Sequence, residues 1–185
     1  MRIFGMSGVP CSGKTTVMRH VISRLGQGKI QKIGILVYQL HESSKCIVLG
    51  SYAKAEFGGT DRLSMAVQPV ALGVIQAWAS DPNMKDWTIL FEGDRLFNSS
   101  FIESLNKIDG LKCVFVMLHA SEKTQKERHK DRGDTQPETW LKGRITKSKR
   151  LQESVEGLTV LKNESLEDLD TNVDWVLHII GLKDK

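Results

Sequence analysis

One segment near the N-terminus fits the pattern G-x-x-x-x-G-K-[ST] without a mismatch: Gly8-Val9-Pro10-Cys11-Ser12-Gly13-Lys14-Thr15. Such a loop turns successive backbone N–H groups toward phosphate oxygens, and the helix that follows it adds partial positive charge. Lys14 is expected to bridge the β- and γ-phosphates of a nucleoside triphosphate, and the Thr15 hydroxyl to ligate Mg²⁺. The residues expected to contact the nucleotide are Gly8, Cys11, Ser12, Gly13, Lys14, Thr15 and Thr16. A chance match is disfavoured because the flanking residues predict a strand before the loop and a helix after it.

Two carboxylates follow an apolar run at residues 87–91, in the segment Glu92-Gly93-Asp94-Arg95. Carboxyl ends of parallel strands gather beside a phosphate loop, so both side chains are placed near the triphosphate. One carboxylate is expected to act on Mg²⁺ through water, with Glu92 as the candidate, and the other to accept a proton from an acceptor hydroxyl. The alternative for Asp94 is a structural one, in which it caps the turn after the strand.

A glycine pair, Gly58-Gly59, precedes Thr60, Asp61 and Arg62. One interpretation is an acceptor site, in which Asp61 holds a hydroxyl and Arg62 holds a phosphate. The other is a loop that leads into a helix, with Thr60 or Asp61 as the N-cap and Arg62 in solvent. The residues alone leave both open.

Basic side chains are concentrated at residues 126–134. Arg128 and Arg132 are four residues apart, so they share one helix face and can reach the same phosphates. A glycine and a proline follow, as a closing lid would need. Trp140, next along the chain, is a candidate for stacking on a base. For any single cation here, a solvated charged helix remains the alternative.

Alternating strands and helices are needed to position these groups. Strands are predicted at 2–6, 32–40, 46–52, 87–91, 112–118 and 158–161, and helices at 14–25, 69–78, 99–108, 121–132, 139–154 and 166–180. The second and third strands are expected to form a hairpin. Continuous apolar runs such as 87–91 are typical of parallel strands that are buried on both faces. The pattern predicts an α/β fold with a parallel sheet in three layers.

Composition limits the class of protein. The 185 residues are 40% hydrophobic and 26% charged, which is typical of one globular domain and excludes a disordered chain. There is no apolar run of about 20 residues, no signal-like N-terminus and no paired cysteine spacing, so we expect a soluble protein of a reducing cytoplasm without membrane association. Residues 1–150 carry a net charge of +9 and residues 151–185 carry −5. Such a basic region either faces a polyanion or is simply solvated.

The order of phosphate loop, acceptor region, acidic strand end and arginine-rich segment resembles the P-loop nucleoside and nucleotide kinases. This resemblance implies a nucleotide-kinase-like P-loop NTPase fold in a single domain over residues 1–185, with an inserted β-hairpin and an arginine-rich lid at about 121–150. It also implies ATP and Mg²⁺ as cofactors. By this resemblance Gly8, Gly13, Lys14 and Thr15 bind ATP and Mg²⁺, Arg128 and Arg132 are lid arginines, and the acceptor site is lined by Asp61, Arg62, Glu92, Asp94 and Arg95. Together with the residue types, this gives Lys14, Asp61, Glu92, Asp94, Arg128 and Arg132 as the expected catalytic residues, and Asp61, Arg62, Arg95 and Trp140 as the expected acceptor-binding residues.

The combination of Gly-Gly-Thr-Asp-Arg-Leu-Ser-Met at 58–65 and Phe-Glu-Gly-Asp-Arg at 91–95 is similar to bacteriophage kinases that phosphorylate hydroxymethyluracil in DNA. That similarity implies transfer of the γ-phosphate of ATP to a base hydroxymethyl group during DNA hypermodification. A polymer acceptor needs a broad positive surface, and a duplex would have to expose the modified base. The alternatives are a (deoxy)nucleoside monophosphate kinase and a P-loop NTPase that is not a kinase.

Overall fold

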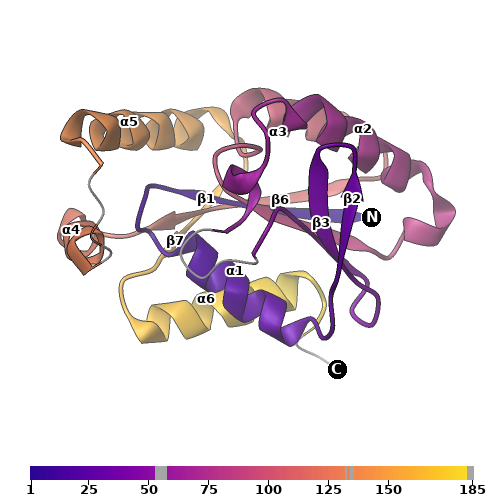
Figure 1. The fold of residues 1–185 in the computed structure, drawn as a ribbon, viewed down its shortest axis with the longest axis horizontal. Coiled ribbons are helices and arrows are strands. Elements are labelled where there is room, and N and C mark those ends of the chain that lie inside the picture. The colour runs from indigo at the N-terminus through magenta and orange to yellow at the C-terminus, as the bar shows by residue number, and fades with distance from the viewer. Residues whose placement is uncertain (53–57, 132, 134–135, 183–185) are drawn as a thin grey trace.

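The computed structural model describes residues 1–52, 58–131, 133 and 136–182. They form a seven-stranded sheet in the order β2-β3-β4-β5-β1-β6-β7 (Figure 1). The strands are β1 (Arg2–Gly8), β2 (Lys29–Ile33), β3 (Leu36–His41), β4 (Cys46–Leu49), β5 (Thr88–Glu92), β6 (Lys112–His119) and β7 (Thr159–Lys162). The helices are α1 (Lys14–Arg24), α2 (Val67–Ser80), α3 (Ser99–Asn106), α4 (Glu122–Asp131), α5 (Glu138–Ser154) and α6 (Leu166–Ile179), with 3₁₀ turns η1 (Thr60–Arg62) and η2 (Pro82–Met84).

The central strands are parallel. β1 pairs in parallel with β5 and β6, β4 pairs in parallel with β5, and β7 with β6. In this register Met6 lies opposite Glu92 and Gly8 opposite Leu118, so the end of β1 lies between the carboxyl ends of β5 and β6. The predicted parallel α/β sheet is confirmed, and its carboxyl edge brings the phosphate loop beside the acidic strand end.

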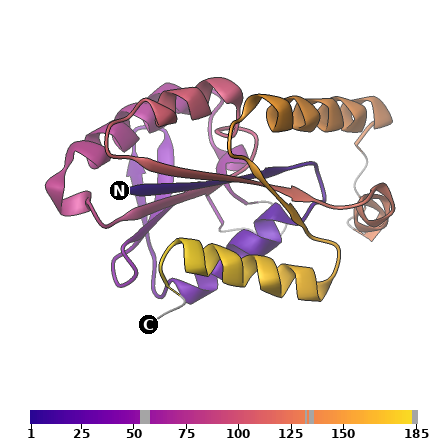
Figure 2. The same cartoon turned by 180° about the vertical axis from the view of Figure 1, so that it is seen from behind.

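Each face of the sheet is covered by helices, which makes three layers. α2, α3 and α5 lie on one side, and α1 and α6 on the other (Figures 1 and 2). A hydrophobic core lies on each face of the sheet, and successive residues of β1 point into different ones. Ile3 is buried with residues of α2 and α3, and Phe4 with residues of α1 and α6. Burial on both faces explains why the central strands are apolar in succession.

At the edge of the sheet, two strands stand where the sequence predicted one. A single strand at 32–40 is wrong, because Gly34 has a φ of 57° and turns the chain between β2 and β3, which pair antiparallel. The predicted hairpin is confirmed for β3 and β4.

Helix α2 begins at Val67, two residues before Pro69, whose missing N–H is harmless in a first helical turn.

Helix α4 lies beyond the carboxyl edge of the sheet (Figure 1). None of the residues of α4 is buried, and the predicted N-cap holds, since Ser121 Oγ accepts a hydrogen bond from Thr124 N at 3.3 Å. Near its end α5 inserts Leu151 into the core. Among the described residues, no helix combines the length and apolar character that crossing a membrane requires.

Candidate active site

A cavity of about 490 Å³ opens at the carboxyl edge of the sheet. Four segments line it: the phosphate loop, the region around η1, the end of β5 with the residues after it, and α5 with the segment just before it. Its wall residues include Gly8, Cys11, Lys14, Thr15, Gly58, Asp61, Met65, Glu92, Asp94, Arg95, Gln136, Trp140, Arg144 and Lys147. Ligands of open α/β sheets bind in this position.

The phosphate loop is held in shape by contacts within itself and with a distant loop. Lys14 Nζ donates to the carbonyl oxygens of Gly8 at 2.7 Å and Val9 at 3.1 Å, so it spans the mouth of the loop. Asn163 Nδ2 donates to Ser12 O at 2.7 Å. Helix α1 begins directly at Lys14, and its N-terminal N–H groups therefore face the same space.

Glu92 lies at the base of the cavity with 1% of its surface exposed. The Thr15 hydroxyl donates to its Oε1 at 2.9 Å. Burial raises the pKa of Glu92 to about 7, against the opposing effects of Lys14 and of the Thr15 hydrogen bond. Gly59 packs on the carboxylate so closely that a Cβ there would collide with it. A hydroxyl beside a buried carboxylate is the oxygen donor set that Mg²⁺ prefers, so Thr15 and Glu92 fit the expected metal site.

Asp61 is fixed at the mouth of the cavity. Its Oδ1 accepts a hydrogen bond from Arg95 N at 2.9 Å, and its carboxyl packs on Gly93, where a Cβ would come within 2.9 Å of Cγ. The side chain of Asp61 keeps contact with solvent, but nearby protein atoms displace part of its hydration. This desolvation, and the negative charge of Asp94, raise the pKa of Asp61 above its ordinary value.

Thr60 bears on the two alternatives that the sequence left open for this segment. It is fully buried and caps no helix, since its hydroxyl donates to Glu92 O at 2.8 Å. The bond ties η1 to the end of β5. Asp61 therefore reaches the cavity, whereas Arg62 is exposed and lines neither this cavity nor the second one described below.

Asp94 faces α5 across the cavity. It pairs with Arg144, and Lys147 Nζ lies 3.7 Å from its Oδ2. The Arg144 guanidinium also stacks over the Trp140 ring, 4.8 Å from its centroid. Trp140, with 37% of its surface exposed, and Met65, with 78%, are the large apolar side chains in the cavity wall.

A second cavity, of about 360 Å³, lies on the other side of the phosphate loop. It is lined by Gly13 and Thr16, by Arg128 of α4, by Glu164 in the loop between β7 and α6, and by Leu166 at the start of α6. Arg128 Nη1 donates to Cys11 O at 3.1 Å, so Arg128 lies against the phosphate loop. The Leu166 side chain is 79% exposed at this site.

Most of the residues singled out from the sequence come together around these two cavities. Arg132 is outside the described residues, and Arg62 points to solvent. Sequence reasoning did not assign a site role to Met65, Arg144, Lys147, Asn163 or Glu164. For Arg144 and Lys147 the only indication in the sequence is that basic residues recur at helical spacing in the α5 segment. The sequence holds no pattern that indicates a site role for the other three.

Comparison with known proteins agrees with this geometry. The model of the family described as P-loop Nucleotide Kinase3 matches residues 1–169. No curated protein matches the chain. Among solved structures, the chain is similar to a gluconokinase from Sinorhizobium meliloti 1021, with a TM-score of 0.52, 13% identity, and coverage of 100% of this chain and 98% of that chain. At that identity the likeness concerns the fold. By its family match, this chain belongs to the P-loop Nucleotide Kinase3 family and is an ATP-dependent kinase.

Proposed function

We propose that this kinase transfers the γ-phosphate of ATP to a hydroxyl group carried by a planar base, and that its acceptor is the hydroxymethyl group of hydroxymethyluracil in phage DNA. One observation carries the proposal: a single cavity joins Lys14 and Thr15 to the carboxylates of Asp61 and Asp94, with Met65 and Trp140 in its wall.

The carboxylates favour a hydroxyl acceptor over a phosphate acceptor. An alcohol must lose its proton as it attacks, so a nearby carboxylate accelerates the reaction. The phosphate of a nucleoside monophosphate is already ionised and needs no base. Asp61 fits the role because its pKa is raised by desolvation and by Asp94, which makes it a stronger base than an ordinary carboxylate.

The apolar side chains in the wall favour a planar acceptor. Trp140 and Met65 come from separate elements, α5 and the segment after η1, and both remain exposed. An aromatic face and a thioether bind a flat base by stacking and dispersion. A polyol would instead need polar partners at these positions.

The surface beside the cavity favours a polymer. The exposed basic residues of α4 and α5 are Lys123, Lys126, Lys130, Lys142, Lys149 and Arg150. Together with the +9 charge of residues 1–150, they supply the phosphate contacts that a nucleic acid strand requires. A modified base in a duplex would reach Asp61 only if it were flipped out.

ATP is assigned to the phosphate loop, with its nucleoside in the second cavity between Arg128 and Leu166. Thr15 and Glu92 would hold Mg²⁺, which neutralises charge on the phosphates when bound. Lys14 orients the phosphates, and Arg128, with Arg132 as the predicted second lid arginine, stabilises their charge. Asp61 accepts the proton of the attacking hydroxyl, and Asp94 keeps Arg144 and Lys147 at the acceptor.

A (deoxy)nucleoside monophosphate kinase is the second candidate. Arg95 favours it, because its Nε is buried in the cavity wall without a hydrogen-bond partner and can donate to a phosphate. Arg144 and Lys147 could serve the same phosphate. If DNA is the acceptor, these three basic side chains bind the backbone phosphate next to the modified base.

Asp61→Asn separates the two candidates. With hydroxymethyluracil DNA as acceptor, we expect kcat to fall about 10²-fold with little change in the KM for ATP, because asparagine still accepts the Arg95 N–H bond but cannot take a proton. Asp109→Asn changes an exposed carboxylate in the turn between α3 and β6, serves as the matched control and should retain wild-type rates. Steady-state kinetics with both substrates provide the measurement. Full activity in Asp61→Asn and also in Asp94→Asn would favour an acceptor that needs no base.

A further inference from the structure

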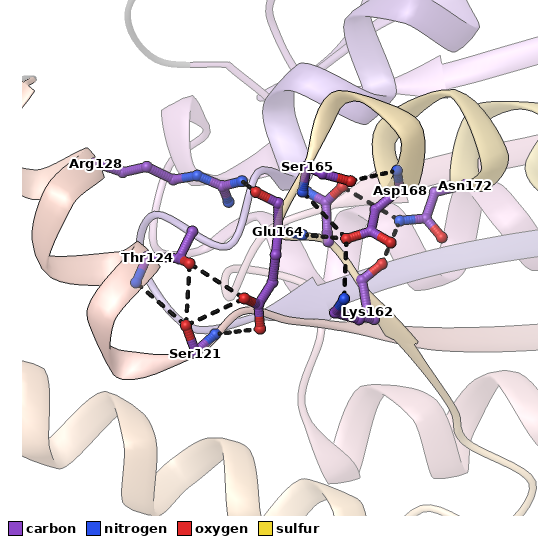
Figure 3. A network of polar contacts seen from close by, with 9 residues as sticks. Ser121, Thr124, Arg128, Lys162, Glu164, Ser165, Asp168 and Asn172 are labelled. Atoms are coloured by element: carbon purple, nitrogen blue, oxygen red, sulfur yellow. Dashed lines mark hydrogen bonds and ion pairs between the residues drawn. The ribbon is translucent and has the colours of Figure 1, made fainter.

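A polar network outside the acceptor cavity connects the start of α4 with the loop between β7 and α6 (Figure 3). Arg128 and Asn163 extend it to the phosphate loop. Its centre is Glu164. The carboxylate accepts a hydrogen bond from Ser121 N at 3.0 Å through Oε1, and bonds from Ser121 Oγ at 3.2 Å and Thr124 Oγ1 at 3.3 Å through Oε2. Partial loss of hydration raises the pKa of Glu164, but these donors outweigh it and hold that pKa below its ordinary value.

The backbone of Glu164 binds the same helix one turn further on. Arg128 Nη2 donates to Glu164 O at 3.3 Å while its Nη1 donates to Cys11 O at 3.1 Å. Thr124 and Arg128 are four residues apart, so both lie on the face of α4 that points at Glu164. The guanidinium therefore bridges the loop after β7, where Figure 3 shows it beside Glu164, and the phosphate loop.

Helix α4 depends on this network because it has no apolar anchor. None of its residues is buried. Polar contacts at its N-terminus and at Arg128 therefore contribute to its position relative to the phosphate loop. Gln125 adds a bond to Ala120 O at 2.6 Å, but that contact stays within the same segment and does not reach the body of the protein.

The loop that carries Glu164 is, by contrast, firmly held. Asp168 Oδ2 accepts from Glu164 N at 2.8 Å and from Ser165 N at 3.1 Å, within a capping box at the start of α6. Asn163 N donates to His119 O at 2.8 Å, and its side chain binds the phosphate loop. Glu164 therefore lies on a loop that several hydrogen bonds hold in place, and it contacts the first turn of a helix that has no buried residue.

We propose that Glu164 is a positioning residue: it clamps the first turn of α4 so that Arg128 points at the triphosphate. The inference rests on the proposed placement of the nucleotide between Arg128 and the loop after β7. Loss of the clamp frees α4, and Arg128 must then be ordered each time the nucleotide binds, which weakens nucleotide affinity.

The direct test is calorimetric titration of the full chain with the non-hydrolysable ATP analogue AMP-PNP and Mg²⁺. For Glu164→Ala we expect the Kd to rise about tenfold, as for loss of one charge-assisted contact. The KM for the acceptor should not change. Glu164→Gln keeps an oxygen acceptor and should recover part of the affinity. The control is Glu167→Ala, the same charge change at an exposed position in the first turn of α6, and it should bind like the wild type.

A double-mutant cycle with Arg128→Ala shows whether Glu164 acts through Arg128. The proposal requires Glu164→Ala to have no further effect on AMP-PNP binding in the Arg128→Ala background. Thr124→Val, which removes one hydroxyl and leaves Glu164 in place, should show a smaller effect with the same dependence on Arg128. If the Glu164 and Arg128 effects simply add, or if Glu164→Ala binds normally while Arg128→Ala does not, the positioning role is wrong and the nucleotide site stands. If Arg128→Ala itself binds normally, the nucleotide placement is wrong as well.

Discussion

Replacement of Lys14 by alanine is expected to slow phosphoryl transfer on the order of 10³-fold or more while the protein stays folded. The Lys14 ammonium group spans the mouth of the phosphate loop, 2.7 Å from Gly8 O and 3.1 Å from Val9 O. It is the cation best placed to stabilise the negative charge of the phosphoryl group during transfer. It packs in neither core cluster, so its loss removes charge and little packing.

The measurement is kcat/KM for ATP, with far-UV circular dichroism and a thermal melt to confirm the fold. Lys85→Ala is the matched control, since Lys85 is exposed at the opposite end of the sheet. Turnover near the wild-type rate in Lys14→Ala would overturn the assignment of the phosphate loop.

Glu92→Gln is expected to lower activity on the order of 10³-fold and, at the same time, to stabilise the protein above pH 7. Glutamine preserves an oxygen acceptor for the Thr15 hydroxyl but cannot supply the charge that a divalent cation requires. Activity of the wild type should also need Glu92 ionised, so its response to Mg²⁺ should strengthen as the pH rises through about 7.

The stability effect follows from the pKa of Glu92, which is raised from 4.5 to about 7 in the folded protein. A raised pKa means that the folded state holds the proton more tightly, so stability is full below pH 4.5 and declines as the pH rises toward 7. The shift corresponds to about 3 kcal/mol. Urea unfolding of Glu92→Gln and the wild type should diverge by up to that amount between pH 4.5 and 8. A variant that is less stable than the wild type at pH 8 would contradict the burial of a charged carboxylate.

The central layout of the site could be predicted because its signals are local. The phosphate loop is a contiguous motif, and Glu92 ends an apolar run whose burial on both faces requires a parallel strand. Parallel strands place their carboxyl ends at one edge, which brings Glu92 and Asp94 to Lys14 without knowledge of any contact.

The remaining features arise from contacts between distant residues that leave no pattern in the sequence. Ser121 and Glu164 are 43 positions apart, and Asp94 and Arg144 are 50 apart. The break at Gly34 was missed because the apolar residues on both sides continue the alternation of one strand. The sequence could not decide between the two interpretations of Arg62, because the orientation of the 3₁₀ turn depends on the hydrogen bond from Thr60 to β5, which only the fold determines.

The most direct test of the central claim is transfer of labelled γ-phosphate from ATP. Hydroxymethyluracil-containing DNA, unmodified DNA of the same sequence, a panel of deoxynucleoside monophosphates and gluconate should be tested in parallel, each with wild-type protein and with Lys14→Ala. We predict label on the modified DNA alone, and none with the variant. Label on a monophosphate or on gluconate, with none on the modified DNA, would contradict the proposed acceptor and reduce the basic surface of α4 and α5 to a solvated face.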